Sequence, residues 1–208
     1  MIRRPPRSTL SSSSAASDVY KRQAKEILEG DIHTANQKAS GLENRDQAKT
    51  FIYAFLYGAG DKKIGEIVGG STKEGKQLKA SFMSKIPAIK SLTSAVHQQV
   101  QKHGYLFGLD GRTLPCRSMH SSLNLLLQSA GAVVMKQALV EFEMDNKDIR
   151  YEIHANVHDE VQFSCDKKEA DALGYSFVSA IIKAGKILNF KCPLDGEYKV
   201  GTNWAETH

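Results

Sequence analysis

The sequence lacks most features of a secreted or membrane-embedded protein. Its three cysteines, Cys116, Cys165 and Cys192, lie far apart and form no C-x-x-C pair. This spacing argues against a disulfide framework or a zinc site and fits a reducing compartment. Apolar runs stay well short of the roughly 20 residues that span a bilayer, and no apolar N-terminal segment marks a secretory signal. We therefore expect no membrane partner.

Large apolar residues are also scarce in residues 1–23, which are rich in Ser, Arg and Pro. Such a composition cannot bury a core and predicts disorder. The segment resembles translated sequencing-adapter sequence, so we expect it to be non-native, with native sequence missing upstream. It carries five cations against one acid, Asp18, and so supplies most of the chain's net charge of +5.

The remaining charge is unevenly distributed. Residues 45–103 contain ten Lys or Arg and four Asp or Glu. Residues 104–208 contain eleven Lys or Arg and fourteen Asp or Glu. A basic half beside a mildly acidic half suits a nucleic-acid reader joined to a metal-holding site. A solvated basic face is the commoner cause of such a bias, and the charge alone does not separate the two.

Hydrophobic spacing and turn residues predict an α+β chain that is mostly helical at first and ends in a small antiparallel sheet with helices. Helices are expected at 31–37, 45–57, 71–85, 87–102, 119–143 and 169–188. Hairpins are expected within 105–116 and 151–164, with one more strand at 197–201. Ser71 and Glu74 predict a capping box, and Asp166 and Glu169 are expected to cap the last long helix.

The helix expected at 45–57 has two different faces. Four polar side chains recur at four-residue spacing in a stripe about 120° wide: Arg45, Lys49, Tyr53 and Tyr57. The other face is apolar and suits a core: Ala48, Phe51, Ile52 and Phe55. Arg and Lys bind phosphate, so the stripe could accommodate a triphosphate, then a sugar, then a base. The alternative is a surface helix with snorkelling cations and tyrosines at its rim.

The second hairpin carries His158, Asp159 and Glu160 at its tip, between strands of alternating polarity with one face expected to be buried. Carboxylates at a tight turn offer hard oxygen ligands to Mg²⁺, which also binds substrate phosphates. A solvated acidic turn would explain the tip equally well if it stood alone.

Together the two motifs, R-x₃-K-x₇-Y-G at 45–58 and strand–HDE–strand at 158–160, resemble the family A DNA polymerases. Similarity extends over nearly all of residues 24–208. It is greatest to the replicative polymerases of T-odd podoviruses, in EILEGDIHTANQ, AKTFIYAFLYGAGDKKIGEIVG, GLDGR, LNLLLQSAGA, VHDEVQ and GTNWAETH.

This resemblance implies a partial right-hand fold, with a fingers subdomain at 24–103 and the C-terminal part of a palm at 104–208. It implies template-directed DNA synthesis in DNA replication, by attack of a primer 3′-OH on a dNTP with two Mg²⁺ ions. The implied dNTP-binding residues are His33, Arg45, Lys49, Tyr53 and Tyr57. The implied primer–template contacts are Asn124, Gln128 and His158, and the implied catalytic residues are Asp159, which also binds metal, Glu160 and Lys49.

The sequence also departs from the family. A second metal-binding Asp is expected upstream of the fingers, where the tail stands instead, and Asp18 does not match it. Thumb, exonuclease and processivity-factor segments would also lie upstream. We therefore expect the chain to be inactive alone, and its parent to be phage-encoded and to act in the host cytoplasm. The alternatives are a single-subunit phage RNA polymerase, against which Glu160 argues, and a non-catalytic DNA- or nucleotide-binding module.

Overall fold

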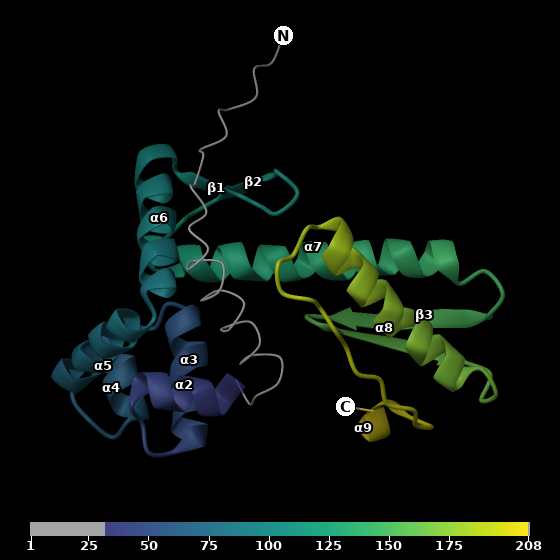
Figure 1. The fold of residues 1–208 in the computed structure, drawn as a ribbon, viewed down its shortest axis with the longest axis horizontal. Coiled ribbons are helices and arrows are strands. Elements are labelled where there is room, and N and C mark those ends of the chain that lie inside the picture. The colour runs from purple at the N-terminus through teal and green to yellow at the C-terminus, as the bar shows by residue number, and fades with distance from the viewer. Residues whose placement is uncertain (1–31, 208) are drawn as a thin grey trace, which may run out of the picture. The chain divides into compact units, whose positions relative to one another are not determined.

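The computed structural model describes residues 32–207 (Figure 1). These residues form two compact units that are described separately. The first comprises residues up to Phe55 and residues 60–87; the second comprises 56–59 and 88–208. The expected boundary lies after residue 103 instead, and the assignment of fingers and palm to these units stays a prediction. The predicted tail, residues 1–23, lies outside the described residues.

The first unit consists of helices. They are α2 (Ile32–Ser40), α3 (Arg45–Leu56, of which Arg45–Phe55 belongs here), α4 (Asp61–Ile67) and α5 (Thr72–Lys85). The predicted capping box begins α5, since the backbone N–H of Ser71 donates to the Glu74 carboxylate at 2.5 Å. Hydrogen bonding with the backbone and the side chain of Ser71 holds the pKa of Glu74 below its ordinary value.

The core of this unit is aromatic. Phe51 and Phe82 are fully buried, with ring centroids 5.3 Å apart and nearly perpendicular planes. The ring of Phe55 lies 5.4 Å from that of Phe82. Edge-to-face pairs of this kind add to the free energy gained from burial, so α3 and α5 are held in a defined rotational setting.

The second unit mixes helices and strands. Its elements are α6 (Pro87–His103), β1 (Tyr105–Phe107), β2 (Thr113–Pro115), η1 (Met119–Ser121), α7 (Ser122–Asp145), β3 (Tyr151–Val157), β4 (Glu160–Cys165), α8 (Ala170–Ile187) and α9 (Trp204–Thr207). The strands form two antiparallel hairpins, β1–β2 and β3–β4, as predicted. The α+β class is therefore confirmed.

Two apolar clusters support this unit. One joins α6 to the β1–β2 hairpin through Val96, Val100, Leu106 and Leu114. The other joins α7, α8 and the β3–β4 hairpin around the fully buried Phe142, whose ring lies 5.2 Å from that of Phe163 and 5.4 Å from that of Phe177. The second cluster fixes the hairpin that carries the predicted metal residues.

Three details of the second unit differ from expectation. The strand predicted at 197–201 is wrong: this segment has no regular secondary structure, and the ring of Tyr198 packs on α8 at Gly174. The predicted buried face of β3 is wrong at Ile153 and Val157, which are 44% and 43% exposed. A register shift between Ile153 and Ala155 breaks the two-residue alternation on which that prediction depended.

The third difference concerns the start of α8. Glu169 occupies its N-cap position but makes no side-chain capping hydrogen bond. The backbone N–H of Glu169 instead donates to the backbone carbonyl of Asp166 at 2.8 Å. The predicted capping by these two side chains is therefore wrong, and a backbone turn from Asp166 to Glu169 leads into the helix instead.

One helix has a property that the sequence analysis did not anticipate. By length and composition alone, Met119–Asp145 could cross a membrane. Core helices of soluble proteins meet the same criterion, and this helix contributes Leu123, Ala138 and Phe142 to buried positions in its unit.

Candidate active site

The polar stripe predicted on α3 is exposed. Arg45 and Lys49 are exposed and Tyr53 is 49% exposed. Ala48, Phe51 and Phe55, on the opposite face, are at most 8% exposed. The two-sided helix is thus confirmed, and the buried rings leave Arg45, Lys49 and Tyr53 one turn apart on the open side.

The first turn of α3 is set by a residue that the sequence analysis missed. The side chain of Asn44 accepts hydrogen bonds from the backbone N–H groups of Asp46 at 2.8 Å and Gln47 at 3.4 Å. Asn is a favoured N-cap residue, and its position directly before Arg45 was the available signal. Helix N-termini favour anions, so this cap places Arg45 at the end of α3 that suits a phosphate.

Tyr57 follows the end of α3 and belongs to the second unit, where it meets Gln128 of α7. The Gln128 side-chain amide donates to the Tyr57 hydroxyl at 3.1 Å. The structure therefore brings together two predicted site residues that are 71 positions apart. Asn124 lies one turn before Gln128 on the same helix and is half-buried, so both amides lie on one side of α7.

Gly58 makes this meeting possible. Its φ is +78°, and a Cβ at this position would lie 2.0 Å from the backbone oxygen of His120. A side chain there would clash with backbone, and φ values in this range are costly for other residues. The glycine of the R-x₃-K-x₇-Y-G motif thus lets the chain after α3 pass against η1.

The predicted metal residues lie at the β3–β4 turn. Val157 pairs with Glu160 across the ladder, which leaves His158 and Asp159 as the turn. His158 has a φ of +57°, a left-handed conformation that is uncommon outside glycine. Both turn side chains are exposed, while Glu160 at the start of β4 is half-buried.

Glu160 is held by two donors. Its Oε1 accepts a hydrogen bond from the Gln162 amide and another, at 3.2 Å, from the indole N–H of Trp204 in α9. Neither donor was assigned a role from sequence. Trp204 was visible only as part of the GTNWAETH similarity, and its separation of 44 residues from Glu160 hid the contact.

The donor set is compatible with a divalent cation but incomplete. Asp159 and Glu160 offer carboxylate oxygens, and Mg²⁺ in phosphate-processing sites often uses one or two carboxylates together with substrate phosphates. Within residues 32–207, His, Cys, Asp and Glu side chains nowhere gather in groups of three or more that could hold a metal ion. A cation here would need substrate oxygens or ligands from elsewhere. The side chain of His33 is not among the described ones.

Comparison with known proteins identifies the family. The sequence model of DNA polymerase family A matches residues 9–206. The chain belongs to this family. Its match begins inside the segment predicted to be a non-native tail, so the boundary at residue 23 stays a prediction.

Phage polymerases are among the most similar family A members. The chain is 41% identical to a DNA-directed DNA polymerase of Escherichia phage Phieco32 over 213 residues, covering 98% of this chain and 34% of that protein. It is 43% identical to the DNA-directed DNA polymerase of Escherichia phage T7 over 208 residues, which cover 89% of this chain and 30% of the phage protein. The predicted resemblance to T-odd phage polymerases is confirmed. The chain spans about a third of the length of these relatives.

A solved structure agrees on the fold. The polymerase domain of Pol1 from M. smegmatis, in complex with DNA primer–template and dNTP, superposes with a TM-score of 0.68. The sequences are 21% identical, and the match covers 77% of this chain and 32% of the other. This likeness supports a partial polymerase fold.

Proposed function

We propose that this chain is part of a phage-encoded DNA-directed DNA polymerase that acts in the host cytoplasm. In the complete enzyme, a primer 3′-OH attacks the α-phosphate of a template-selected dNTP and pyrophosphate leaves. The observation that carries the proposal is the exposed Arg45–Lys49–Tyr53 face of α3, in a chain 43% identical to the T7 polymerase. A role for the whole enzyme in replication follows from the phage relatives.

Different side chains bind different parts of the dNTP. Arg45 and Lys49 bind the triphosphate and offset its charge, the first as a planar fork and the second as a compact cation. Tyr53 then lies beside the sugar. His33 is proposed to contact the same triphosphate. This order follows the order of the side chains along α3.

A second group of residues contacts the DNA and the base pair being formed. Tyr57 stacks near the templating position, and its hydroxyl is oriented by Gln128. Gln128 and Asn124 read the minor groove of the primer–template, where acceptors are similar for every base pair and so report shape rather than sequence. His158, at the hairpin turn, contacts the primer terminus.

Asp159 and Glu160 are the residues of this chain that would hold a divalent cation, which we propose to be Mg²⁺, with two ions in the complete enzyme. When bound, such ions supply charge stabilisation at the phosphate oxygens. The protein residues contribute position: Lys49 holds the triphosphate, and the β3–β4 turn presents Asp159 to solvent. Preorganised charges of this kind are a principal source of catalysis.

A reconstructed enzyme tests this proposal. Residues 24–208 would be joined to the upstream part of the T7 polymerase and assayed for primer extension with Mg²⁺. We expect extension that Asp159→Ala abolishes and that Asp148→Ala, at an exposed acid elsewhere in the second unit, leaves intact. An active Asp159→Ala variant, or a reconstructed enzyme that cannot extend primers, would refute the assignment.

The isolated chain tests the non-catalytic alternative. The small number of carboxylates at the β3–β4 turn favours a non-catalytic role for the fragment when it is separated from the rest of the enzyme. We expect the 208-residue chain to give no primer extension, because one or two carboxylates cannot hold two ions in the geometry of phosphoryl transfer. Extension above background that disappears in Asp159→Ala would show that the fragment is a complete catalyst. Binding of labelled primer–template without extension would support a binding role for the fragment. Catalysis, and the binding of a processivity factor, would then require other segments of the enzyme.

A further inference from the structure

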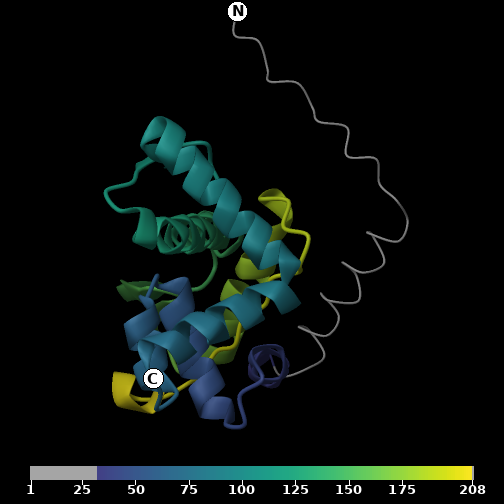
Figure 2. The same cartoon turned by 90° about the vertical axis from the view of Figure 1, so that its left-hand side faces the viewer.

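The segment that joins α8 to α9, residues 190–203, is called here the C-terminal strap. It has no regular secondary structure, yet its side chains alternate: Cys192, Leu194, Gly196 and Tyr198 are half-buried and the residues between them are exposed. Figures 1 and 2 show it in yellow, leaving the end of α8 and reaching α9. This alternation reflects a segment that lies along α8, where Leu194 contacts Gly185 and Tyr198 contacts Gly174.

Tyr198 fixes the strap to the first half of α8. A Cβ at Gly174 would lie 2.3 Å from the Tyr198 ring, so the ring occupies the place of the missing side chain. The Tyr198 hydroxyl donates to the Asp171 carboxylate at 3.2 Å, and its ring lies 5.1 Å from that of Tyr175. Burial, with the neighbouring Tyr175 and Asp171, raises the pKa of Tyr198 to about 12, so the hydroxyl keeps its proton.

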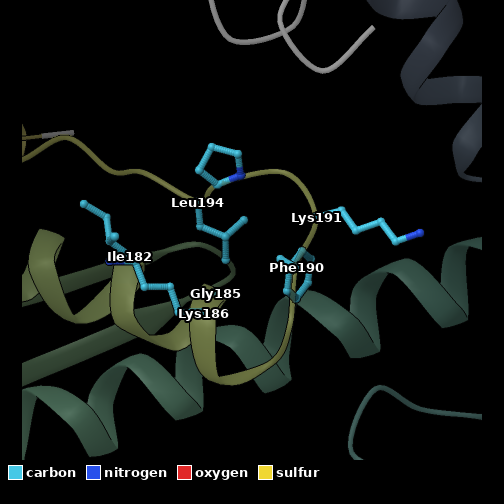
Figure 3. A pocket seen from close by; sticks show the side chains of 7 residues that line it. Ile182, Gly185, Lys186, Phe190, Lys191 and Leu194 are labelled. Atoms are coloured by element: carbon cyan, nitrogen blue, oxygen red, sulfur yellow. The ribbon is translucent and has the colours of Figure 1, made fainter. Parts of the chain in front are cut away.

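The other end of the strap is packed less completely. Leu194 lies over Gly185, where an added Cβ would be 2.9 Å from its side chain. Beside it is a cavity of about 180 Å³ lined by residues of α8 and the strap, shown in Figure 3. The strap therefore contacts glycines of α8 at two points, Gly185 and Gly174.

Beyond Tyr198 the strap closes its own turn. The Glu206 carboxylate accepts hydrogen bonds from the Thr202 backbone N–H at 2.7 Å and the Asn203 amide at 2.8 Å. These bonds hold the pKa of Glu206 below its ordinary value, mainly through Thr202. The turn delivers two donors to β4: the Trp204 indole to Glu160 at 3.2 Å, and the Thr207 hydroxyl to Gln162 at 3.2 Å.

We propose that Tyr198 and Trp204 are positioning residues: the strap, fixed at Gly174, holds the Trp204 indole against Glu160 and so directs that carboxylate at the metal-binding turn. Gln162 is a second donor to the same carboxylate oxygen, but it lies on the same strand and restrains Glu160 only locally. Trp204 adds a restraint from 44 residues away. The role of Glu160 rests on the proposed polymerase function; the attachment of the strap does not.

The attachment can be measured on the 208-residue chain, because Trp204 is its single tryptophan. We expect Tyr198→Ala to lower the steady-state anisotropy of Trp204 and to raise its quenching by iodide, at most about twofold because its side chain is already 52% exposed. Tyr198→Phe keeps the ring over Gly174 and should restore most of the wild-type signal. Val200→Ala, at a 54% exposed position of the strap, is the matched control and should change neither signal.

Gly174→Ala is a second variant that separates release of the strap from unfolding. Alanine favours the helix, so the far-ultraviolet circular dichroism of α8 should be retained while the added methyl displaces Tyr198. We expect the same fall in Trp204 anisotropy. Anisotropy and quenching that stay at wild-type values in both Gly174→Ala and Tyr198→Ala would overturn the attachment.

The positioning role is tested in the reconstructed enzyme with Mn²⁺, whose binding can be followed directly by electron paramagnetic resonance. We expect Trp204→Phe, which keeps an aromatic ring but loses the N–H, to weaken Mn²⁺ binding roughly three- to tenfold. The rate at saturating metal should change far less. Unchanged Mn²⁺ affinity in Trp204→Phe would overturn the positioning role. Failure of the unmodified reconstructed enzyme to extend primers would instead refute the proposed function, whereas the fluorescence measurements would still decide the attachment.

Discussion

The face of α3 and the β3–β4 turn both present predicted site residues to solvent, but they are supported differently. Behind Lys49 and Tyr53 lie Phe51 and Phe55, packed on Phe82 within the same unit. Beside Asp159, Val157 is 43% exposed, and the Phe142 cluster contacts the hairpin at Tyr151 and Phe163 rather than at the turn. The α3 face therefore has buried rings directly behind it, whereas the position of Glu160 beside the turn also depends on a hydrogen bond from the distant Trp204.

This difference implies that the two parts of the site respond differently to substitutions elsewhere in the chain. A helix face needs only a periodic sequence, so a substitution on its open side should leave its position unchanged. A hairpin turn that relies on a remote donor can lose its geometry through a change 44 residues away. Four expected outcomes test this comparison.

The largest expected effect is on stability. Phe51→Ala removes a fully buried ring and should lower the free energy of unfolding by about 3–5 kcal/mol. Val157→Ala removes a 43% exposed side chain and should cost within about 0.5 kcal/mol, as for ordinary surface positions. Urea denaturation of the 208-residue chain measures both, and similar costs for the two variants would remove the contrast between the regions.

The next effect concerns the open side of α3. In the reconstructed polymerase, Lys49→Ala should lower kcat/KM for dNTP by about 10- to 100-fold, since hydrogen bonds to charged groups contribute about 1.5–3 kcal/mol. Lys76→Ala, at an exposed position of α5, is the control and should have little effect. Melting temperatures of the two variants should match. Unchanged nucleotide kinetics in Lys49→Ala would show that the polar stripe is only a solvated face.

These two tests correspond to what the sequence could predict. The positions of Phe51 and Lys49 followed from a local period of 3.6 residues, and the structure confirms their opposite exposure. The turn at Asp159 also followed from local alternation. By contrast, the hydrogen bond between Trp204 and Glu160 joins residues with no common periodicity, so no local pattern could have predicted it.

The strand predicted at 197–201 failed for a related reason. A short strand-like sequence does not show which element will cover it, and within this segment only Tyr198 is half-buried. Here the cover is α8, and the glycine at position 174 that receives Tyr198 lies 24 residues earlier in the chain. The exposed Ile153 likewise shows that alternation predicts a potential face, whereas burial depends on a neighbouring element.

A smaller effect concerns Tyr53, at the sugar end of the α3 face. A dideoxynucleotide lacks the 3′-OH that a normal dNTP brings, and a partner left without its hydrogen bond costs about 1–3 kcal/mol. The Tyr53 hydroxyl can fill that place and a Phe ring cannot. Tyr53→Phe should therefore lower dideoxynucleotide incorporation about tenfold or more, because 1.4 kcal/mol corresponds to a factor of ten.

Competition between ddNTP and dNTP in the reconstructed enzyme provides the measurement for Tyr53. Incorporation of normal dNTP should change little, since its own hydroxyl remains, and this internal comparison serves as the control. Equal discrimination by the wild type and Tyr53→Phe would remove Tyr53 from the sugar site and would limit the proposed nucleotide face to Arg45 and Lys49.

The smallest effect tests the dependence of the second unit on long-range contacts. Lys183 of α8 contacts two carboxylates of α7, Glu141 at 2.8 Å and Asp145 at 2.9 Å. Hydrogen bonding from Lys183, with a further bond from Gln137, holds the pKa of Glu141 below its ordinary value of 4.5, and the same contacts raise the pKa of Lys183 above 10.5. A lowered acid pKa contributes stability that is present above 4.5 and is lost as the pH falls through the folded value. A raised lysine pKa contributes stability below 10.5 that is lost as the pH rises through its folded value.

Lys183→Met should therefore destabilise the 208-residue chain most between pH 5 and pH 10, as seen in the urea midpoint. The gap in urea midpoint between the variant and the wild type should narrow as the pH falls below 4.5 and Glu141 becomes protonated. We expect this effect to be the smallest of the four, because the side chains of Lys183 and Asp145 are 44% and 56% exposed and exposed ion pairs contribute little. Lys186→Met, at an exposed lysine one turn later on α8, should show no such pH-dependent gap. A gap for Lys183→Met that stays constant from pH 7 to pH 3 would mean that packing of the lysine stem, rather than its charge, joins α8 to α7.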